Sequence, residues 1–263
     1  MPGPISVFEA VEWREPAPGG GSQAQVFRLS DGRFAIVKFP ENPQGELVLA
    51  NEFLSCQLAE VLDLPINRAV MVSIDERLLR LPRQDGKIPA TFSAGIRCGM
   101  IRFEQAEGAQ AAQISTACQN NAELVSVLVF DQLVCQTNPG QYLMYPTSDG
   151  AKRFAAHDYG YVFGGSPGWS AATLGGIPPA TLPLTDPLNG QPYPDGSKVS
   201  SIIDKLRQVT DVLINDALIR LQPPRWAATL ADVQALVPIL LARAQSLVHQ
   251  FDERYPKQQV EAL

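Results

Sequence analysis

The chain has 263 residues, of which 45% are apolar, and it carries a formal net charge of −6 at pH 7. This length is enough for one large domain or two lobes with a sizeable core. A chain with a pI near 5.0 is not expected to bind nucleic acid or an anionic membrane surface. No signal peptide is apparent and no apolar stretch reaches the roughly 20 residues that span a bilayer, so we expect a cytoplasmic protein with no membrane partner.

The cysteines and histidines argue against three classes of site. The four cysteines are far apart, and three lie in apolar or helical stretches, so we expect reduced core thiols rather than a disulfide framework (Cys56, Cys98, Cys118 and Cys135). The two histidines, His157 and His249, give no pair with metal-ligand spacing, so structural zinc is not expected. Neither is accompanied by the Gly-x-Ser-x-Gly turn of a serine hydrolase. Nucleotide chemistry is the sharper hypothesis.

Residues 1–104 are predicted to form a strand-rich N-terminal lobe with one helix. The turn Ser30-Asp31-Gly32 separates two apolar runs and predicts a hairpin. A helix is predicted over 46–62, because Leu47, Ala50, Leu54, Leu58 and Val61 recur every three or four residues. Glu52 falls beside that stripe. The predicted strands are 25–29, 33–38, 69–74, 77–81 and 96–103.

A glycine-rich turn, a strand lysine and a helix carboxylate follow one another in this lobe. Gly19-Gly-Gly-Ser-Gln23 precedes Lys38, and Lys38 precedes Glu52. In protein-kinase-like folds such glycines close over the phosphates of ATP, the lysine neutralises them, and the carboxylate orients the lysine. Alternatively, Lys38 is a strand-end lysine that reaches water, Glu52 is a surface residue like Glu46 and Glu60, and the glycines are a flexible turn.

Residues 105–263 are predicted to form a helical C-terminal lobe. A helix over 122–135 is apolar almost all round, as expected for the centre of a lobe. A loop, 136–141, and two short strands, 142–145 and 153–156, lead to His157-Asp158-Tyr159-Gly160.

A long loop and further helices complete the chain. Residues 164–198 contain 7 Gly and 7 Pro, too many for regular structure. Trp169 in this loop is expected either to dock on the body of the protein or to meet a partner, whereas Trp226 is expected to anchor the core. Helices are predicted over 210–221 and 229–254, the second with Thr229 and Asp232 as a capping box and Pro238 as a kink or break.

These segments, in this order, resemble the small HipA-like kinases. The resemblance covers most of the chain through short motifs, at 20–23, 34–39, 48–54, 62–65, 129–134, 156–160, 223–226 and 236–247. It implies an α+β, bilobal protein-kinase-like fold that binds ATP and magnesium. By resemblance, Lys38 pairs with Glu52 and reaches the phosphates, Asp158 holds magnesium, and Phe103 and Glu104 lie at the hinge near adenine. The residues that would cover the phosphates are Gly20, Gly21, Ser22 and Gln23.

The catalytic loop departs from the family pattern. The family's loop reads approximately Asn-x-Asp-Arg-x-x-x-Asn, whereas the same count here gives Gln136-Thr137-Asn138 followed by Pro139-Gly140-Gln141, about two residues shorter. Asn138 stands at the position of the aspartate, and an amide cannot accept a proton as a carboxylate does. Gln141 is a candidate for the metal-side asparagine, and Asp131, Asp149 or Asp158 for a replacement carboxylate.

Two functions follow from these features. The first is an ATP-dependent phosphotransferase with weak or altered activity, whose acceptor by resemblance is a serine or threonine of a protein. The second is a pseudokinase that acts as a partner-binding module, for which the 164–198 loop is a candidate surface. Lys38, Glu52 and Asp158 favour nucleotide binding under both hypotheses, whereas Asn138 favours the second.

Overall fold

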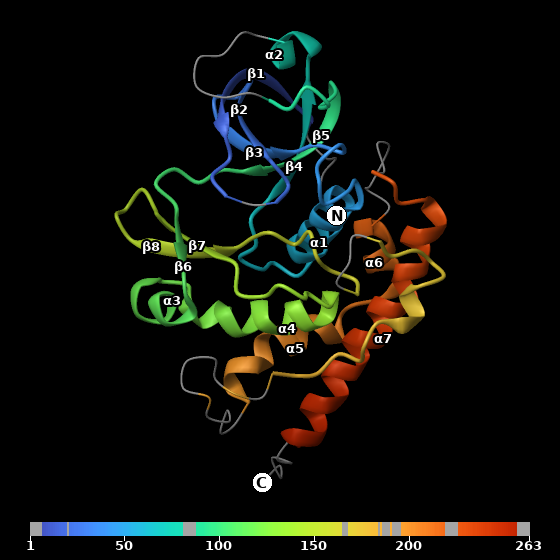
Figure 1. Cartoon of the computed structure of the whole chain (residues 1–263). Helices are drawn as coiled ribbons and strands as arrows, with labels where there is room; N and C mark the ends of the chain where they lie inside the picture. The colour runs from blue at the N-terminus through green and yellow to red at the C-terminus, as the bar shows by residue number, and fades with distance from the viewer. Residues whose placement is uncertain are drawn as a thin grey trace.

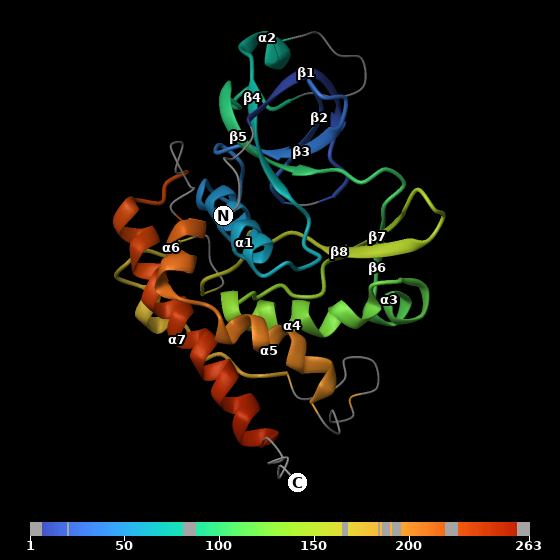
Figure 2. The same cartoon turned by 180° about the vertical axis from the view of Figure 1, so that it is seen from behind.

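The computed structural model describes residues 7–19, 21–80, 88–164, 168–183, 185, 190, 196–218 and 226–256. The N-terminal part is a closed five-stranded β-barrel and the C-terminal part is mainly helical (Figure 1). Helix α1 (Leu47–Val61) lies between the two parts in both views (Figures 1 and 2). The connection that leaves the barrel runs through residues 102–106.

The barrel has the strand order β1-β2-β3-β5-β4, and a parallel pairing of β1 with β4 closes it. The hairpin predicted around Ser30-Asp31-Gly32 is β2–β3, where Gly32 has the positive φ (+89°) that favours glycine. The first strand was not predicted individually, because only Ala10 of its ten residues is buried and its apolar alternation is weak. The strands are β1 (Val7–Pro16), β2 (Gln25–Leu29), β3 (Phe34–Lys38), β4 (Ala69–Ile74) and β5 (Gly95–Ile101).

The strand predicted over 77–81 is wrong. Residues Glu76–Arg80 form a short helix, α2, and Leu81 lies outside the described residues. Asp75 accounts for the difference, because its Oδ1 accepts a hydrogen bond from the Arg77 amide (2.8 Å) and so caps the helix start. The apolar pair of α2, Leu78 and Leu79, is partly buried against the barrel core.

Helix α1 is buried on every side over Leu47 to Ala59, not only along the predicted apolar stripe. Its polar residues Asn51, Glu52, Ser55 and Gln57 are buried as well. On one side Phe53 meets the Trp226 ring edge-on, with centroids 5.9 Å apart, which confirms Trp226 as a core anchor. The helix is therefore held by barrel and helical part together.

The C-terminal part contains a small sheet, β6-β7-β8, between the barrel and α4 (Figure 1). Helix α4 has no exposed residue, as predicted, whereas β6, α3 and α5 were not predicted individually. The elements are β6 (Glu107–Ala109), α3 (Ala111–Ala117), the 3₁₀ turn η1 (Asn121–Glu123), α4 (Leu124–Val134), β7 (Tyr142–Pro146), β8 (Lys152–Ala156), the 3₁₀ turn η2 (Leu174–Gly176), α5 (Ser197–Arg207), α6 (Asp211–Leu218) and α7 (Leu230–Arg254).

Helix α7 begins at the predicted capping box, since the Thr229 side chain accepts from the Asp232 amide at 3.0 Å. It continues through Pro238 to Arg254, so the proline does not split it. Its 25 residues have a mean hydropathy of 1.2 in the most apolar window, enough by length and composition to cross a membrane. Here the helix packs its apolar side chains into the core, a pattern that core helices of the same length share.

The four cysteines carry free thiols, as predicted. Three are buried and Cys135, which follows α4 with a left-handed φ of +52°, is half-buried. In the described part of the 164–198 segment, the regular structure before α5 is the 3₁₀ turn η2. The predicted loop is therefore confirmed there, except that α5 already includes its last two residues.

Gly99 in β5 tests how tightly the barrel is packed. A Cβ at this position would lie 2.7 Å from Val72 Cγ2 and 3.3 Å from Ala35 Cβ. We therefore expect Gly99→Ala to lower the free energy of unfolding by about 1–3 kcal/mol through overpacking. Gly108→Ala in β6 is the matched control, since its Cβ would meet nothing within 4 Å. Urea denaturation of both variants measures the difference, and equal stabilities would contradict this packing.

Candidate functional site

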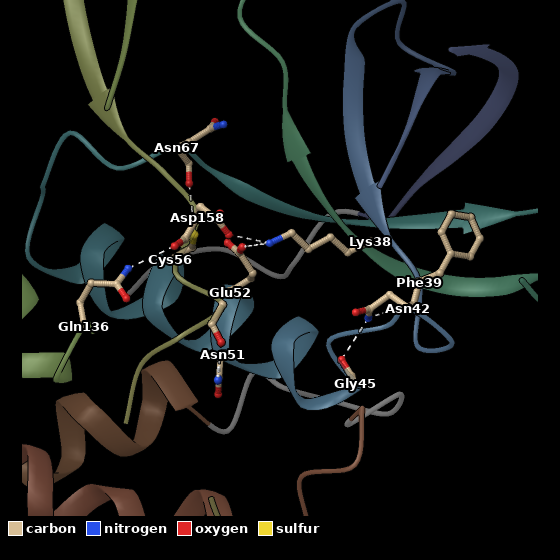
Figure 3. Close-up of polar contacts among 11 residues, drawn as sticks. Lys38, Phe39, Asn42, Gly45, Asn51, Glu52, Cys56, Asn67, Gln136 and Asp158 are labelled. Carbon is tan, nitrogen blue, oxygen red and sulfur yellow. Dashed lines mark hydrogen bonds and ion pairs between the residues drawn. The ribbon is translucent and has the colours of Figure 1, made fainter. Parts of the chain in front are cut away.

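Three side chains from distant parts of the chain meet around one ammonium group (Figure 3). Lys38 Nζ donates to Glu52 Oε1 and, at 2.8 Å, to Asp158 Oδ1. The Lys38 side chain is 11% exposed and that of Glu52 1%, whereas Asp158 is 37% exposed. Glu52 is thus shielded from solvent, whereas Asp158 is partly exposed to it.

The local structure explains why these three residues meet. Lys38 ends β3, where it pairs with Cys98 of β5, and its side chain leaves the barrel toward α1. Glu52 projects from the buried second turn of α1. Asp158 follows β8 with a left-handed φ of +62°, which is uncommon for a residue other than glycine. Gly160 permits the close approach of this loop to α1, because a Cβ there would lie 2.8 Å from Val48 Cγ1.

The Glu52 and Asp158 carboxylates share the Lys38 ammonium, and the difference in their burial sets the direction in which each pKa shifts. Burial opposes the charge of Lys38, but the attraction of Glu52 and Asp158 outweighs it and raises the lysine pKa. Burial raises the pKa of Glu52, against the attraction of Lys38. The pKa of Asp158 is lowered, because Lys38 outweighs a smaller degree of burial. Asp158 is therefore the carboxylate that stays ionised and faces solvent.

The glycine-rich turn connects β1 to β2 and ends beside the lysine strand. Gln25, the first residue of β2, pairs with Val37, next to Lys38. Ser22 is buried, and Gln23 is exposed with a φ of +51°. Gly21 lies against the Gln44 side chain, whose Nε2 would be 3.0 Å from a Cβ at this position. Gly20 lies outside the described residues.

Phe103 and Glu104 lie in the connection between the barrel and the small sheet. The Phe103 ring stacks on Tyr145 of β7, with centroids 4.0 Å apart and an interplanar angle of 2°. Glu104 is exposed. They lie between β5 and β6 in the chain, and their predicted place at a hinge near adenine stays a prediction.

Loop 136–141 is held beside the Asp158 loop, largely through main-chain groups. The Gln136 side chain donates to the Asp158 carbonyl at 3.1 Å (Figure 3). It also accepts from the Asn138 amide at 3.3 Å. The Gln141 carbonyl accepts from the His157 amide at 3.0 Å. Asn138 is exposed and Gln141 is half-buried. Loop 136–141 therefore lies next to the Asp158 loop, and the catalytic roles of Asn138 and Gln141 stay predictions.

Two of the three carboxylates considered as replacements lie elsewhere. Asp149 belongs to the turn between β7 and β8, where its Oδ1 accepts from Thr147 Oγ1 and from the Ala151 amide. Asp131 is buried in α4 and accepts from the Tyr159 hydroxyl at 2.8 Å. Only Asp158 lies at the site itself.

Sequence reasoning missed Asn51 and Gln136 as members of this region. Asn51 joins α1 to the Gly160 carbonyl and to Trp169, and Gln136 joins the two loops. The available signal for Asn51 was a polar residue beside Glu52, directly after the apolar run 47–50. Trp169 itself is 7% exposed. It therefore docks on the body of the protein, which is one of the two alternatives predicted for it.

Solved structures with similar folds include kinases. The crystal structure of a Helicobacter pylori proinflammatory kinase, CtkA, matches with a TM-score of 0.59 and 13% identity, over 96% of this chain and 98% of that one. Hydra Fam20 with sugar matches at 0.54 and 12%, over 97% and 90%. The Golgi casein kinase matches at 0.52 and 12%, over 98% and 74%. These likenesses show a protein-kinase-like fold of mixed helix and strand content. No protein-family model and no curated protein matches the sequence.

The buried Asp131 carboxyl gives a pH dependence that can be measured. Burial raises its pKa from 3.8 to about 7, although the hydrogen bond from Tyr159 pulls the other way. Between these values the folded state binds more protons than the unfolded state, so the free energy of unfolding falls as pH rises. We expect Asp131→Asn to remove this contribution, which is at most about 1.4 kcal/mol per pH unit.

Chemical denaturation of the wild type and Asp131→Asn from pH 4 to pH 7.5 measures the difference in slope. The asparagine keeps an acceptor for Tyr159 and carries no charge, so it isolates the ionisation. Parallel curves for the two proteins would show that Asp131 titrates alike in the folded and unfolded states.

Proposed function

We propose that the chain is a HipA-like kinase homologue that binds ATP and magnesium at Lys38, Glu52 and Asp158. The observation that supports this is the position of the Lys38 ammonium, which is buried between the solvent-shielded Glu52 and the partly exposed Asp158. Such an ammonium offers charge to phosphate oxygens, while Glu52 fixes its direction. In this proposal the barrel and helical part act as two lobes, with the glycine-rich turn over the phosphates and Phe103 and Glu104 near adenine.

The residues present fit a magnesium ion that keeps most of its ligands from phosphate and water. Among the described residues, no three His, Cys, Asp or Glu side chains gather as a metal cage. Magnesium is usually bound through one or two carboxylates together with substrate phosphates. Asp158 supplies one carboxylate that is ionised and partly exposed. Gln141 is the second proposed ligand. The bound ion would neutralise the charge on the transferred phosphoryl group.

The acceptor hydroxyl would need a base to take its proton. In phosphotransferases with this fold an aspartate of the catalytic loop does so. Here loop 136–141 contains no carboxylate, and the exposed Asn138 stands at that position. We therefore propose weak or altered phosphoryl transfer to a serine or threonine of a protein.

The absence of a carboxylate from loop 136–141 also favours a second candidate function, that of a pseudokinase. Such a protein would keep the nucleotide, or the fold alone, and act by binding another protein. The described part of the 164–198 segment docks on α7 and α1, so a partner surface there would have to use the exposed side chains that remain.

Nucleotide binding is tested with the buried lysine. ATP with magnesium should raise the thermal stability of the wild type, by about 2.7 kcal/mol at a hundred-fold excess over Kd. We expect Lys38→Met to abolish most of this shift, because the methyl thioether fills the space of the side chain without its charge. Replacing magnesium by chelator should also reduce the shift.

Lys152→Met is the matched control. Lys152 is a strand lysine of β8 that is half-exposed and pairs with Glu107 at 3.3 Å, away from Lys38. This variant should retain the full shift. A wild-type melting temperature that does not respond to millimolar ATP with magnesium would refute the proposed nucleotide site.

The missing base is tested by restoring it. General-base assistance is worth about 100- to 10,000-fold where the geometry permits, and misplacement by about 1 Å costs roughly 100-fold. We expect Asn138→Asp to raise the transfer of labelled phosphate by up to about 100-fold. Asn138 is exposed, so the substitution should leave the fold intact.

Asn121→Asp in η1 adds the same charge at another exposed asparagine and should leave transfer unchanged. Nucleotide binding without any gain in Asn138→Asp would favour the pseudokinase. Wild-type transfer that Asn138→Asp does not alter and Asp158→Asn abolishes would place the base elsewhere.

A further inference from the structure

Asn51 is a fully buried polar residue at the centre of three elements. It precedes Glu52 on α1, and none of its surface is exposed. Its Nδ2 donates to the Gly160 carbonyl at 2.8 Å, and its Oδ1 accepts from Trp169 Nε1 at 2.6 Å. Figure 3 shows Asn51 and Glu52 on the same stretch of α1. One amide thus joins the glutamate helix, the Asp158 loop and the segment that follows it.

Trp169 belongs to the described segment 168–183, in which the regular structure is the 3₁₀ turn η2. Helix α7 holds this segment at several points. Asp232 Oδ1 accepts from the Ala171 amide at 2.8 Å, and Gln250 Nε2 donates to the Ala180 carbonyl at 2.9 Å. Between them, the buried Arg243 guanidinium donates to the Pro178 carbonyl and to two carbonyls at the end of α4. Trp169, edge-on to Phe163 at 5.7 Å, is the point where this segment reaches α1.

The position of Asn51 couples this segment to both carboxylates around Lys38. Asn51 and Glu52 are consecutive on one helix, so a shift of the helix at Asn51 also moves Glu52. Gly160 lies two residues after Asp158 and packs closely on α1, since a Cβ there would lie 2.8 Å from Val48 Cγ1. Without the Trp169 donor, Asn51 Oδ1 would be buried and unpaired, which favours a rearrangement of α1 or the loop.

We infer that Asn51 is a positioning residue, through which docking of Trp169 sets the alignment of Glu52 and Asp158 around Lys38. The inference rests on the proposed nucleotide site. It makes nucleotide affinity depend on a residue that touches neither nucleotide nor metal. By reciprocity, bound nucleotide must stabilise the docked segment to the same extent.

The alternative is that Asn51 and Trp169 only stabilise the core. Asn120 provides a control for that role, because it too is a buried asparagine whose side chain is hydrogen-bonded, in its case through three bonds, one of them from Nδ2 to Glu123 Oε2 at 3.3 Å. Its Nδ2 donates to the Phe154 carbonyl at 3.1 Å and its Oδ1 accepts from the Phe154 amide at 3.0 Å. It joins η1 to β8, and none of these hydrogen bonds involves α1. A structural role alone predicts that Asn120 and Trp169 variants behave alike.

The experiment compares Trp169→Phe, which keeps the ring and removes the donor, with Asn120→Ala. The affinity for ATP with magnesium is measured at a temperature where both variants stay folded. We expect Trp169→Phe to weaken binding about tenfold, within the usual range of about 5- to 150-fold for coupled sites. Asn120→Ala should leave it within about twofold. Equal effects of the two variants on affinity would overturn the inference.

Hydrogen exchange gives a second measurement that does not require nucleotide. Trp169→Phe should speed amide exchange in α1 and in 157–163 more than Asn120→Ala does. In the wild type, ATP with magnesium should slow exchange in 168–174. If the wild type binds no nucleotide, the proposed function fails, and hydrogen exchange alone then tests the inference. Unchanged protection of α1 and 157–163 in Trp169→Phe would overturn the inference as well.

Discussion

Burial of the Lys38 ammonium is the constraint on which the arrangement of this protein depends. A charged group removed from water is tolerated only when it is paired and hydrogen-bonded. Glu52 and Asp158 provide the pairing, and they come from a helix and a loop that are far apart in the sequence. Barrel, α1 and the loop after β8 must therefore assemble together, because none of them satisfies the charge alone.

The same constraint explains the unusual burial of α1. A helix that presents one charged residue to a barrel usually keeps its opposite face in water. Here Phe53 packs on Trp226 on one side while Asn51 and Glu52 form polar contacts on another. Because both faces are occupied, rotation of α1 would break apolar packing and buried hydrogen bonds together. The structure is that of a site held in one alignment.

The sequence predicted the parts of the site that are recognisable one at a time. The positions of Lys38 at a strand end, Glu52 on a helix and Asp158 after a strand all follow from local patterns, and the structure brings the three together. The strand predicted at 77–81 is wrong, because a single capping residue, Asp75, outweighs an apolar pair. The contact of Asn51 with Trp169 could not be predicted, since it joins residues 118 positions apart through a segment without periodicity.

The Lys38 site and loop 136–141 are held by different kinds of contact. The site around Lys38 is held by charged side chains, with Lys38 donating to both Glu52 and Asp158. Loop 136–141 is instead held by the Gln136 amide, the Thr137 hydroxyl and main-chain groups, and none of these contacts uses the side chain of residue 138. The residue at this position can therefore change without disturbing the loop or the Lys38 site. Under the proposed function, loss of the base is thus compatible with a complete nucleotide site, so a kinase-like fold could keep binding nucleotide while its catalytic rate falls.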